Sequence, residues 1–145
     1  MERDALPSST RAIGAEDYEA LAAFRHALRR FLAFSEGAAR VSGLTAQQHQ
    51  AILAIKGHRP GEPITIGDLA DHLLIRHHSA VELVDRLVHA ELVSRSTAED
   101  DRRRVVIDLT PRAEAILRDL SATHIEELKR SKLLLVQLLE RLDAS

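Results

Sequence analysis

The hydrophobic period of this chain changes near residue 92, and that change limits the folds available to it. Upstream, apolar residues recur at i, i+3, i+4 and i+7 through Ala80, Leu83, Val84 and Leu87, the spacing of an amphipathic helix. Downstream, residues 93–97 and 105–109 alternate in polarity on either side of a charged connection. That pattern is typical of a β-hairpin. The chain therefore places a hairpin directly after a helix that ends near Glu91.

Helix-start signals divide the rest of the chain. Thr45 with Gln48, and Thr65 with Asp68, have the spacing of capping boxes. Thr110-Pro111 combines a good N-cap with a proline at the first helical position. A very short strand is expected near Ile64, and a tight turn at residues 74–75 should separate the third and fourth helices.

These elements predict a mainly α fold with a small β-hairpin wing, a winged helix-turn-helix flanked by dimerisation helices. The expected organisation is a flexible tail (1–15), an N-terminal dimerisation region (16–44), a DNA-binding domain (45–110) and C-terminal dimerisation helices (111–145). The apolar surface at residues 133–142 exceeds what one amphipathic helix of a small domain needs. It predicts a homodimer.

Composition narrows the functional classes. The chain has 145 residues, no cysteine and a formal net charge of −2, so thiol chemistry is excluded and DNA binding would need a local basic patch. It has no apolar run of membrane-spanning length and no signal-peptide pattern, which predicts a cytoplasmic protein without a membrane partner. No phosphate loop, dinucleotide fingerprint or nucleophile elbow is present. An enzyme is therefore not expected, and no cofactor is expected either.

Four segments carry a resemblance. They are residues 69–73 (LADHL), 79–87 (SAVELVDRL), 92–95 (LVSR) and 101–111 (DRRRVVIDLTP). Together they resemble the MarR family of bacterial regulators, with similarity over roughly residues 16–143. The resemblance implies a homodimer on a palindromic operator in double-stranded DNA, in most such families weakened by a small ligand or metal. The sequence departs from the family pattern at Leu74, Arg76 and Glu91, where a turn glycine, a helix-capping Asp or Ser, and a second glycine are usual.

The first half of the fourth helix holds the candidate DNA-reading residues. At 100° per residue, the face opposite the core stripe includes His78, Val81 and Glu82. The predicted base readers are His77, His78, Val81 and Glu82, and the predicted phosphate contacts are Arg76 and Ser79. Two alternatives stay open, namely that Glu82 only pairs with Arg86 and that Val81 is a stray surface residue.

Three adjacent arginines, Arg102, Arg103 and Arg104, stand at the expected hairpin tip. They are predicted to contact DNA, and the resemblance places Arg103 in the minor groove. Asp101 is expected to orient a wing arginine or to pair with Arg95, so that both support the wing. The alternative is a tip that is merely solvated.

A ligand pocket is expected where the dimerisation helices meet the DNA-binding part, near Phe24, Arg25, Leu28 and Leu53. The eight histidines form no HExxH motif, so no metal site is predicted. Binding of the operator, release by a small-molecule effector and repression are the expected function. The alternative function is a winged-helix dimer that serves as a protein-interaction module or a metal sensor.

Overall fold

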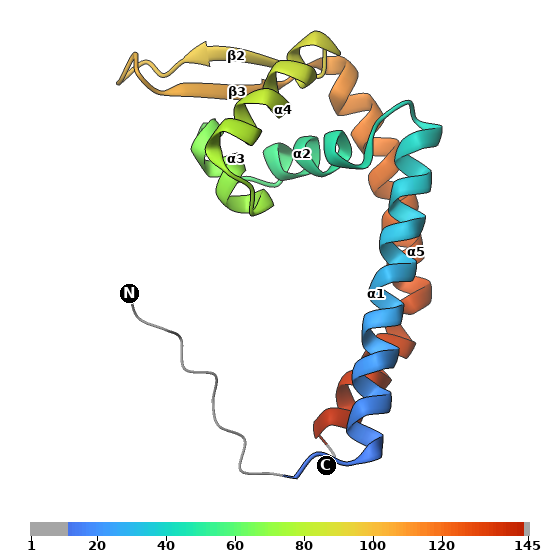
Figure 1. Ribbon diagram of the computed structural model, residues 1–145. Helices are drawn as coiled ribbons and strands as arrows, with labels where there is room; N and C mark the ends of the chain where they lie inside the picture. The colour runs from blue at the N-terminus through green and yellow to red at the C-terminus, as the bar shows by residue number, and fades with distance from the viewer. Residues whose placement is uncertain (1–11, 144–145) are drawn as a thin grey trace. The chain divides into compact units, whose positions relative to one another are not determined.

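The computed structural model describes residues 12–143 and confirms the predicted fold class (Figure 1). Five helices and a small sheet follow one another as α1 (Ala15–Val41), α2 (Ala46–Lys56), β1 (Ile64–Thr65), α3 (Ile66–Leu73), α4 (His77–His89), β2 (Val93–Thr97), β3 (Val105–Leu109) and α5 (Pro111–Asp143). Most of the predicted tail at 1–15 lies outside the described residues. The C-terminal helical region is one uninterrupted helix.

The chain forms two compact units, and both boundaries fall inside long helices. The first unit comprises α1 up to Leu32 and α5 from Glu127 onward, and the second comprises residues 33–126. The second unit therefore contains α2, α3, α4 and the sheet, together with the end of α1 and the start of α5.

The second unit is built around one hydrophobic core. The sheet is antiparallel with strand order β1-β3-β2, and its register pairs Ile64 with Ile107 and Val93 with Leu109. The predicted stripe of α4 is buried as expected. The largest fully buried side chains of the described residues come from α2, α3, α4, the sheet and the residue before it: Ile52, Leu69, Leu83, Val84, Leu87, Leu92 and Ile107.

Both predicted capping boxes are present. The Thr45 hydroxyl accepts from the Gln48 N–H at 3.1 Å, and the Gln48 side chain accepts from the Thr45 N–H at 3.0 Å. Thr65 and Asp68 repeat this arrangement with the same two distances. The hydrogen bond from the Thr65 N–H is the main reason why the pKa of Asp68 is lowered. Each box satisfies two backbone N–H groups that a helix start leaves without partners.

The two positions where the resemblance leads one to expect glycine keep a left-handed backbone. Leu74 has φ 57° and ends α3, while Glu91 has φ 60° and follows the end of α4 at His89 and its cap Ala90. The left-handed conformation costs a non-glycine residue roughly 1–2 kcal/mol. The turn geometry is thus retained without the residue that would adopt it most easily.

The first unit has very little core of its own. Among its described residues, Ala20 of α1 and Leu138 of α5 are the buried hydrophobic side chains. Figure 1 shows this part of α1 beside the C-terminal half of α5, and an ion pair of 3.6 Å joins Glu19 to Arg141. Leu133, Leu134 and Leu139 remain half exposed or more.

Within residues 12–143, no helix combines the length and the apolarity that a membrane span requires.

Candidate nucleic-acid interface

The first half of α4 presents the predicted reading residues to solvent. Arg76, His77, His78 and Glu82 are exposed, and Ser79 is half-buried. Arg76 occupies the N-cap position, but its side chain makes no capping hydrogen bond. The N–H groups of the first turn therefore stay available, and such groups are natural partners for phosphate oxygens.

Glu82 and Val81 differ in how closely they fit the prediction. Glu82 is exposed, and within residues 12–143 no ion pair joins it to Arg86. Val81 is half-buried and packs against the core, so its position is not the wet one that the sequence predicted. The reason is that the wing folds back along α4: Val81 helps to line a groove together with Arg95 and Val105 of the hairpin.

This groove lies between the start of α4 and the wing. Its volume is about 670 Å³. Its walls come from α3, α4, β2 and β3 and consist of Ile66, His77, Val81, Arg95, Ser96, Thr97 and Val105. An apolar floor with a histidine and an arginine at the rim suits a sugar–phosphate backbone, which presents apolar sugar carbons and anionic oxygens side by side.

The tip of the wing is a tight turn organised by Asp101. Its carboxylate accepts from the Arg103 N–H at 2.9 Å, and its carbonyl oxygen accepts from the Arg104 N–H at 3.0 Å. The Ala98 N–H donates to the Arg104 carbonyl at 2.9 Å and closes the loop. Asp101 therefore organises the turn that carries the wing arginines, and it does so through their backbone N–H groups.

All three wing arginines are exposed. Arg104 forms an ion pair with Asp100 at 3.4 Å. In the part of the chain that the structure describes, the guanidinium groups of Arg102 and Arg103 have no such partner. Two cations are thus unneutralised at the end of the hairpin.

Arg95 does not pair with Asp101, which corrects one of the two roles predicted for that aspartate. Its guanidinium instead forms an ion pair of 2.5 Å with Asp85 of α4. Sequence spacing did not reveal this pair because its two members lie on different elements, ten residues apart. The pair instead ties β2 of the wing to α4.

The C-terminal end of α4 is held by Thr110, which the sequence indicated only as a helix start, and by Arg112, which it did not single out. The Thr110 hydroxyl donates to the Glu91 carbonyl at 2.7 Å, and the Thr110 N–H donates to the Leu92 carbonyl at 3.0 Å. The Arg112 guanidinium donates to the Ala90 carbonyl. The Thr110 hydroxyl also accepts from the Ala113 N–H at 3.2 Å, as the predicted N-cap should. The start of α5 thereby satisfies carbonyls next to the end of α4.

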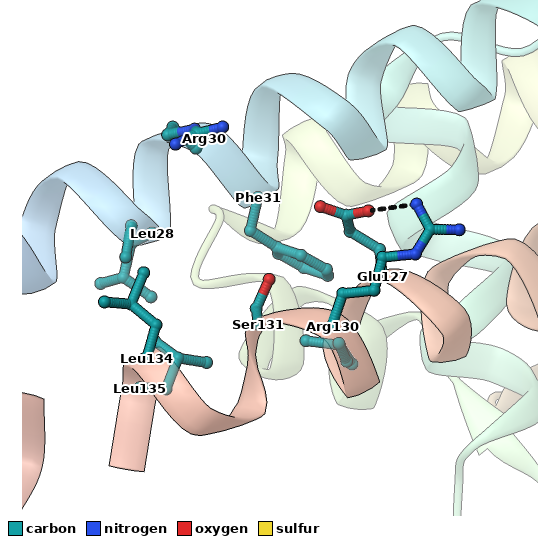
Figure 2. A pocket seen from close by; sticks show the side chains of 10 residues that line it. Leu28, Arg30, Phe31, Glu127, Arg130, Ser131, Leu134 and Leu135 are labelled. Atoms are coloured by element: carbon teal, nitrogen blue, oxygen red, sulfur yellow. Dashed lines mark ion pairs between the residues drawn. The ribbon is translucent and has the colours of Figure 1, made fainter. Parts of the chain in front are cut away.

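A cavity of about 370 Å³ lies within the first unit, between α1 and α5 (Figure 2). Figure 2 shows Leu28 facing Leu134 and Leu135, while Phe31 points toward Ser131. Of the four residues predicted to form a ligand pocket, Leu28 lines this cavity. Phe24 and Arg25 are on α1 but are not part of its lining, and Leu53 belongs to the second unit.

Residues 12–143 contain no cluster of three or more acidic or histidine side chains that could hold a metal ion.

The fold and this surface define the class of protein, a winged helix-turn-helix protein. Its helix α4 and its hairpin together form an exposed, partly cationic face. Residues 42–104 match the model of the MarR family. The matched residues take in α2, α3, α4 and β2, and the sequence motifs of this chain resemble the same family.

A relative described as a transcriptional regulator shares part of this sequence. An uncharacterised HTH-type transcriptional regulator of Bacillus subtilis (strain 168), YfiV, is 32% identical over 88 residues, which are 61% of this chain. Those residues span 53% of YfiV, so the match covers about half of that protein.

Solved structures support the fold over a longer stretch. AbsC, a MarR family transcriptional regulator from Streptomyces coelicolor, has a TM-score of 0.73 and 23% identity, covering 93% of this chain and 92% of AbsC. A MepR mutant of S. aureus bound to an oligodeoxyribonucleotide has a TM-score of 0.66 and 20% identity, covering 86% of this chain and 97% of MepR. The similarity thus extends beyond the winged domain to the long helices.

Proposed function

We propose that this protein is a sequence-specific DNA-binding transcriptional regulator that acts as a repressor. The observation that carries the proposal is the joint exposure of the first half of α4 and of Arg102 and Arg103 at the wing tip. A helix of this kind fits the major groove, where base edges can be distinguished. Unneutralised arginines on a narrow hairpin suit the negative potential of the adjacent minor groove.

The proposed roles follow from the chemistry and position of each side chain. Glu82 accepts a hydrogen bond from a cytosine amino group, and His77 and His78 contact base edges or nearby phosphates. Arg76, Ser79 and the free N–H groups of the first turn of α4 bind phosphate. Arg103 enters the minor groove, flanked by Arg102 and Arg104.

The active form is proposed to be a homodimer on a palindromic operator. Support comes from the first unit, whose two helices bury few side chains and leave Leu133, Leu134 and Leu139 at 68%, 50% and 50% exposure. A second copy that covers these side chains would supply the missing core. Two reading helices in successive major grooves require half-sites about 10 base pairs, or roughly 34 Å, apart.

Release by a small ligand is the last part of the proposal. The cavity beside Leu28 and Phe31 is mainly apolar, and its volume of about 370 Å³ is within the size range of small-molecule sites. A ligand that prefers a dimer with wrongly spaced reading helices would lower operator affinity by as much as its two affinities differ.

The test of DNA binding uses fluorescence anisotropy with the DNA upstream of the protein's own gene. A shuffled duplex of equal length and composition is the control. Tighter binding to the upstream DNA, with affinity that falls steeply as salt rises, is the expected result. Equal affinity for both duplexes would contradict sequence-specific binding, and no binding to either would favour a protein partner instead.

A further inference from the structure

One polar side chain is buried in the described part of the chain, and it lies away from the candidate DNA surface. His49 of α2 is 3% exposed. Its ring lies against that of His124 on α5, with 4.8 Å between centroids, and Phe34 of α1 packs edge-on against His124 at 5.4 Å. The two imidazoles thus meet where α1, α2 and α5 pack together inside the second unit.

The hydrogen bonds of His124 show which of its ring nitrogens carries a hydrogen. Nδ1 lies 2.6 Å from the Leu120 carbonyl oxygen, and because a carbonyl only accepts, Nδ1 carries a hydrogen. Nε2 lies 2.7 Å from the Ser35 hydroxyl. That hydroxyl donates to Nε2 of the neutral ring, and by rotating it can accept from Nε2 of the charged ring. Both ring nitrogens of His124 therefore have hydrogen-bond partners.

His49 is in a different situation. Within residues 12–143 no side chain or carbonyl hydrogen-bonds to its ring. Burial lowers the pKa of His49, and the neighbouring His124 lowers it further. A proton on His49 would create an unpaired charge in a buried place next to a second imidazole.

Other charged groups of the packed elements do not offset that charge. On α1, Glu36 and Arg40 are exposed and pair with each other at 3.5 Å. Lys56 of α2 pairs with Glu114 of α5 at 3.0 Å. Within the described residues, the only charged group whose field contributes to the lowered pKa of His49 is His124.

The position of α2 matters because α2 packs against α3, and α3 against α4. Ile52 of α2 is fully buried in the core that these helices share. A shift of α2 that exposed the His49 ring further would therefore disturb the packing that supports α4.

We propose that the His49–His124 pair is an acid-sensitive joint: uptake of a proton by the buried His49 beside His124 moves α2 and weakens DNA binding. The DNA-binding part rests on the proposed function. The joint itself does not.

The direction of the pH effect follows from linkage. Above pH 6.5, the ordinary value for this residue, His49 is neutral in both the folded and the unfolded chain. Below pH 6.5, His49 takes up a proton in the unfolded chain but stays neutral in the folded chain, because its pKa there is lowered. The free energy of unfolding therefore decreases as the pH drops, until the pH passes below the pKa of the folded chain. Each unit of difference between the two pKa values changes the folding equilibrium about tenfold.

The first experiment measures the full-length protein without DNA. Urea midpoints are recorded from pH 8 to 5 for wild type, His49→Gln, His124→Gln and a control, His26→Gln, whose side chain is exposed. NMR of the wild-type imidazoles reports the titration of His49 directly. We expect the midpoint to fall with acid in wild type and His26→Gln, to fall less in His124→Gln and to stay nearly level in His49→Gln.

Equal pH slopes in wild type and His49→Gln would overturn the joint. So would titration of His49 at its ordinary value. If His49→Gln does not fold, the His124→Gln comparison and the wild-type NMR titration still decide the matter, since burial without the neighbouring charge must give a smaller shift.

The second experiment measures affinity for the upstream duplex at pH 7.5 and 5.5 at fixed salt. Wild type and His49→Gln share His77 and His78, so direct effects of those residues cancel in the comparison. A severalfold larger loss on acidification in wild type is expected, and equal losses would disconnect the joint from DNA binding. If neither protein binds DNA at either pH, the proposed function fails, whereas the unfolding and NMR results still establish or refute the joint.

Discussion

Arg95 of β2 and Asp85 of α4 form an ion pair of 2.5 Å that fastens the wing to the reading helix. The two side chains are 40% and 55% exposed, so solvent screens much of their attraction. Their importance is geometric, because the pair links two elements that, in the proposed function, enter neighbouring grooves of one duplex.

The first prediction concerns this pair. Asp85→Ala should lower the free energy of unfolding by no more than about 1 kcal/mol, as expected for an exposed ion pair. Operator affinity should fall by more than that loss explains, because the wing is then free to swing. Urea unfolding beside anisotropy measures both quantities. Asp108→Ala, an exposed change on β3, is the matched control, and equal affinities for the two variants would contradict the geometric role.

The second prediction concerns the wing tip. Arg103→Ala should strongly weaken DNA binding and leave the melting temperature nearly unchanged, since exposed substitutions usually alter stability by about 0.5 kcal/mol or less. Losing one phosphate-neutralising cation per subunit should also reduce the slope of log affinity against log salt by about one per subunit. Anisotropy over a salt series provides the measurement.

Arg102→Ala and Arg104→Ala are the controls for that experiment and should have smaller effects. Arg104 already has a partner in Asp100. Unaltered binding by Arg103→Ala would mean that the wing does not touch DNA, and a much lower melting temperature would instead assign Arg103 a structural role.

The third prediction separates two neighbours on α4. Glu82→Ala should change which base is preferred at one operator position, with a difference of roughly 1–3 kcal/mol in discrimination. Val81→Ala should mainly reduce stability, because Val81 packs against the core and lines the groove beside the wing. Binding to a set of operators mutated at each position distinguishes the two variants. If Glu82→Ala retained the wild-type ranking of operators, Glu82 would not read a base.

A fourth prediction uses the left-handed turn at Leu74. Its side chain is 91% exposed, so Leu74→Gly sacrifices little packing while removing the strain of φ 57°. The gain of roughly 1–2 kcal/mol is partly offset by the larger entropy of glycine in the unfolded chain. A small increase in unfolding free energy is expected from urea titration. Leu73→Gly is the contrasting variant, and it should destabilise because Leu73 packs on the core from within α3.

The fifth prediction is an obligate dimer. Sedimentation at micromolar concentration should show a single dimeric species, and Leu134→Glu should shift it toward monomer and lower its stability. Leu134 is 50% exposed and is one of the side chains that a second copy should cover. A folded monomer in the wild-type sample would contradict the prediction.

Local chemistry explains why most of the fold could be predicted from the sequence. Both capping boxes, the stripe of α4 and the hairpin depend on residues only a few positions apart, and all of them are present. Thr110-Pro111 likewise begins α5 at Pro111. These signals involve near neighbours, so the rest of the molecule does little to alter them.

Parts of the candidate site could not be predicted because they depend on contacts between distant elements. The sequence indicated that Arg95 supports the wing, but it did not reveal Asp85 as the partner. The helical period places Val81 on the solvent-exposed face of α4, because the helix pattern alone cannot show that the hairpin packs along it. His49 lies one turn before Ile52 on α2, so the helical period did contain a signal for a core-facing histidine, whereas its proximity to His124 depends on the tertiary fold.

The attachment of α4 to α5 has a consequence for how this surface tolerates mutation. The acceptors at residues 90, 91 and 92 are all main-chain carbonyls, and the donors come from Thr110 and Arg112. An attachment made in this way depends on side chains from the start of α5 only. Sequence drift can therefore alter the side chains at positions 90 and 91 without removing an acceptor, while drift at 110 or 112 removes a donor at once.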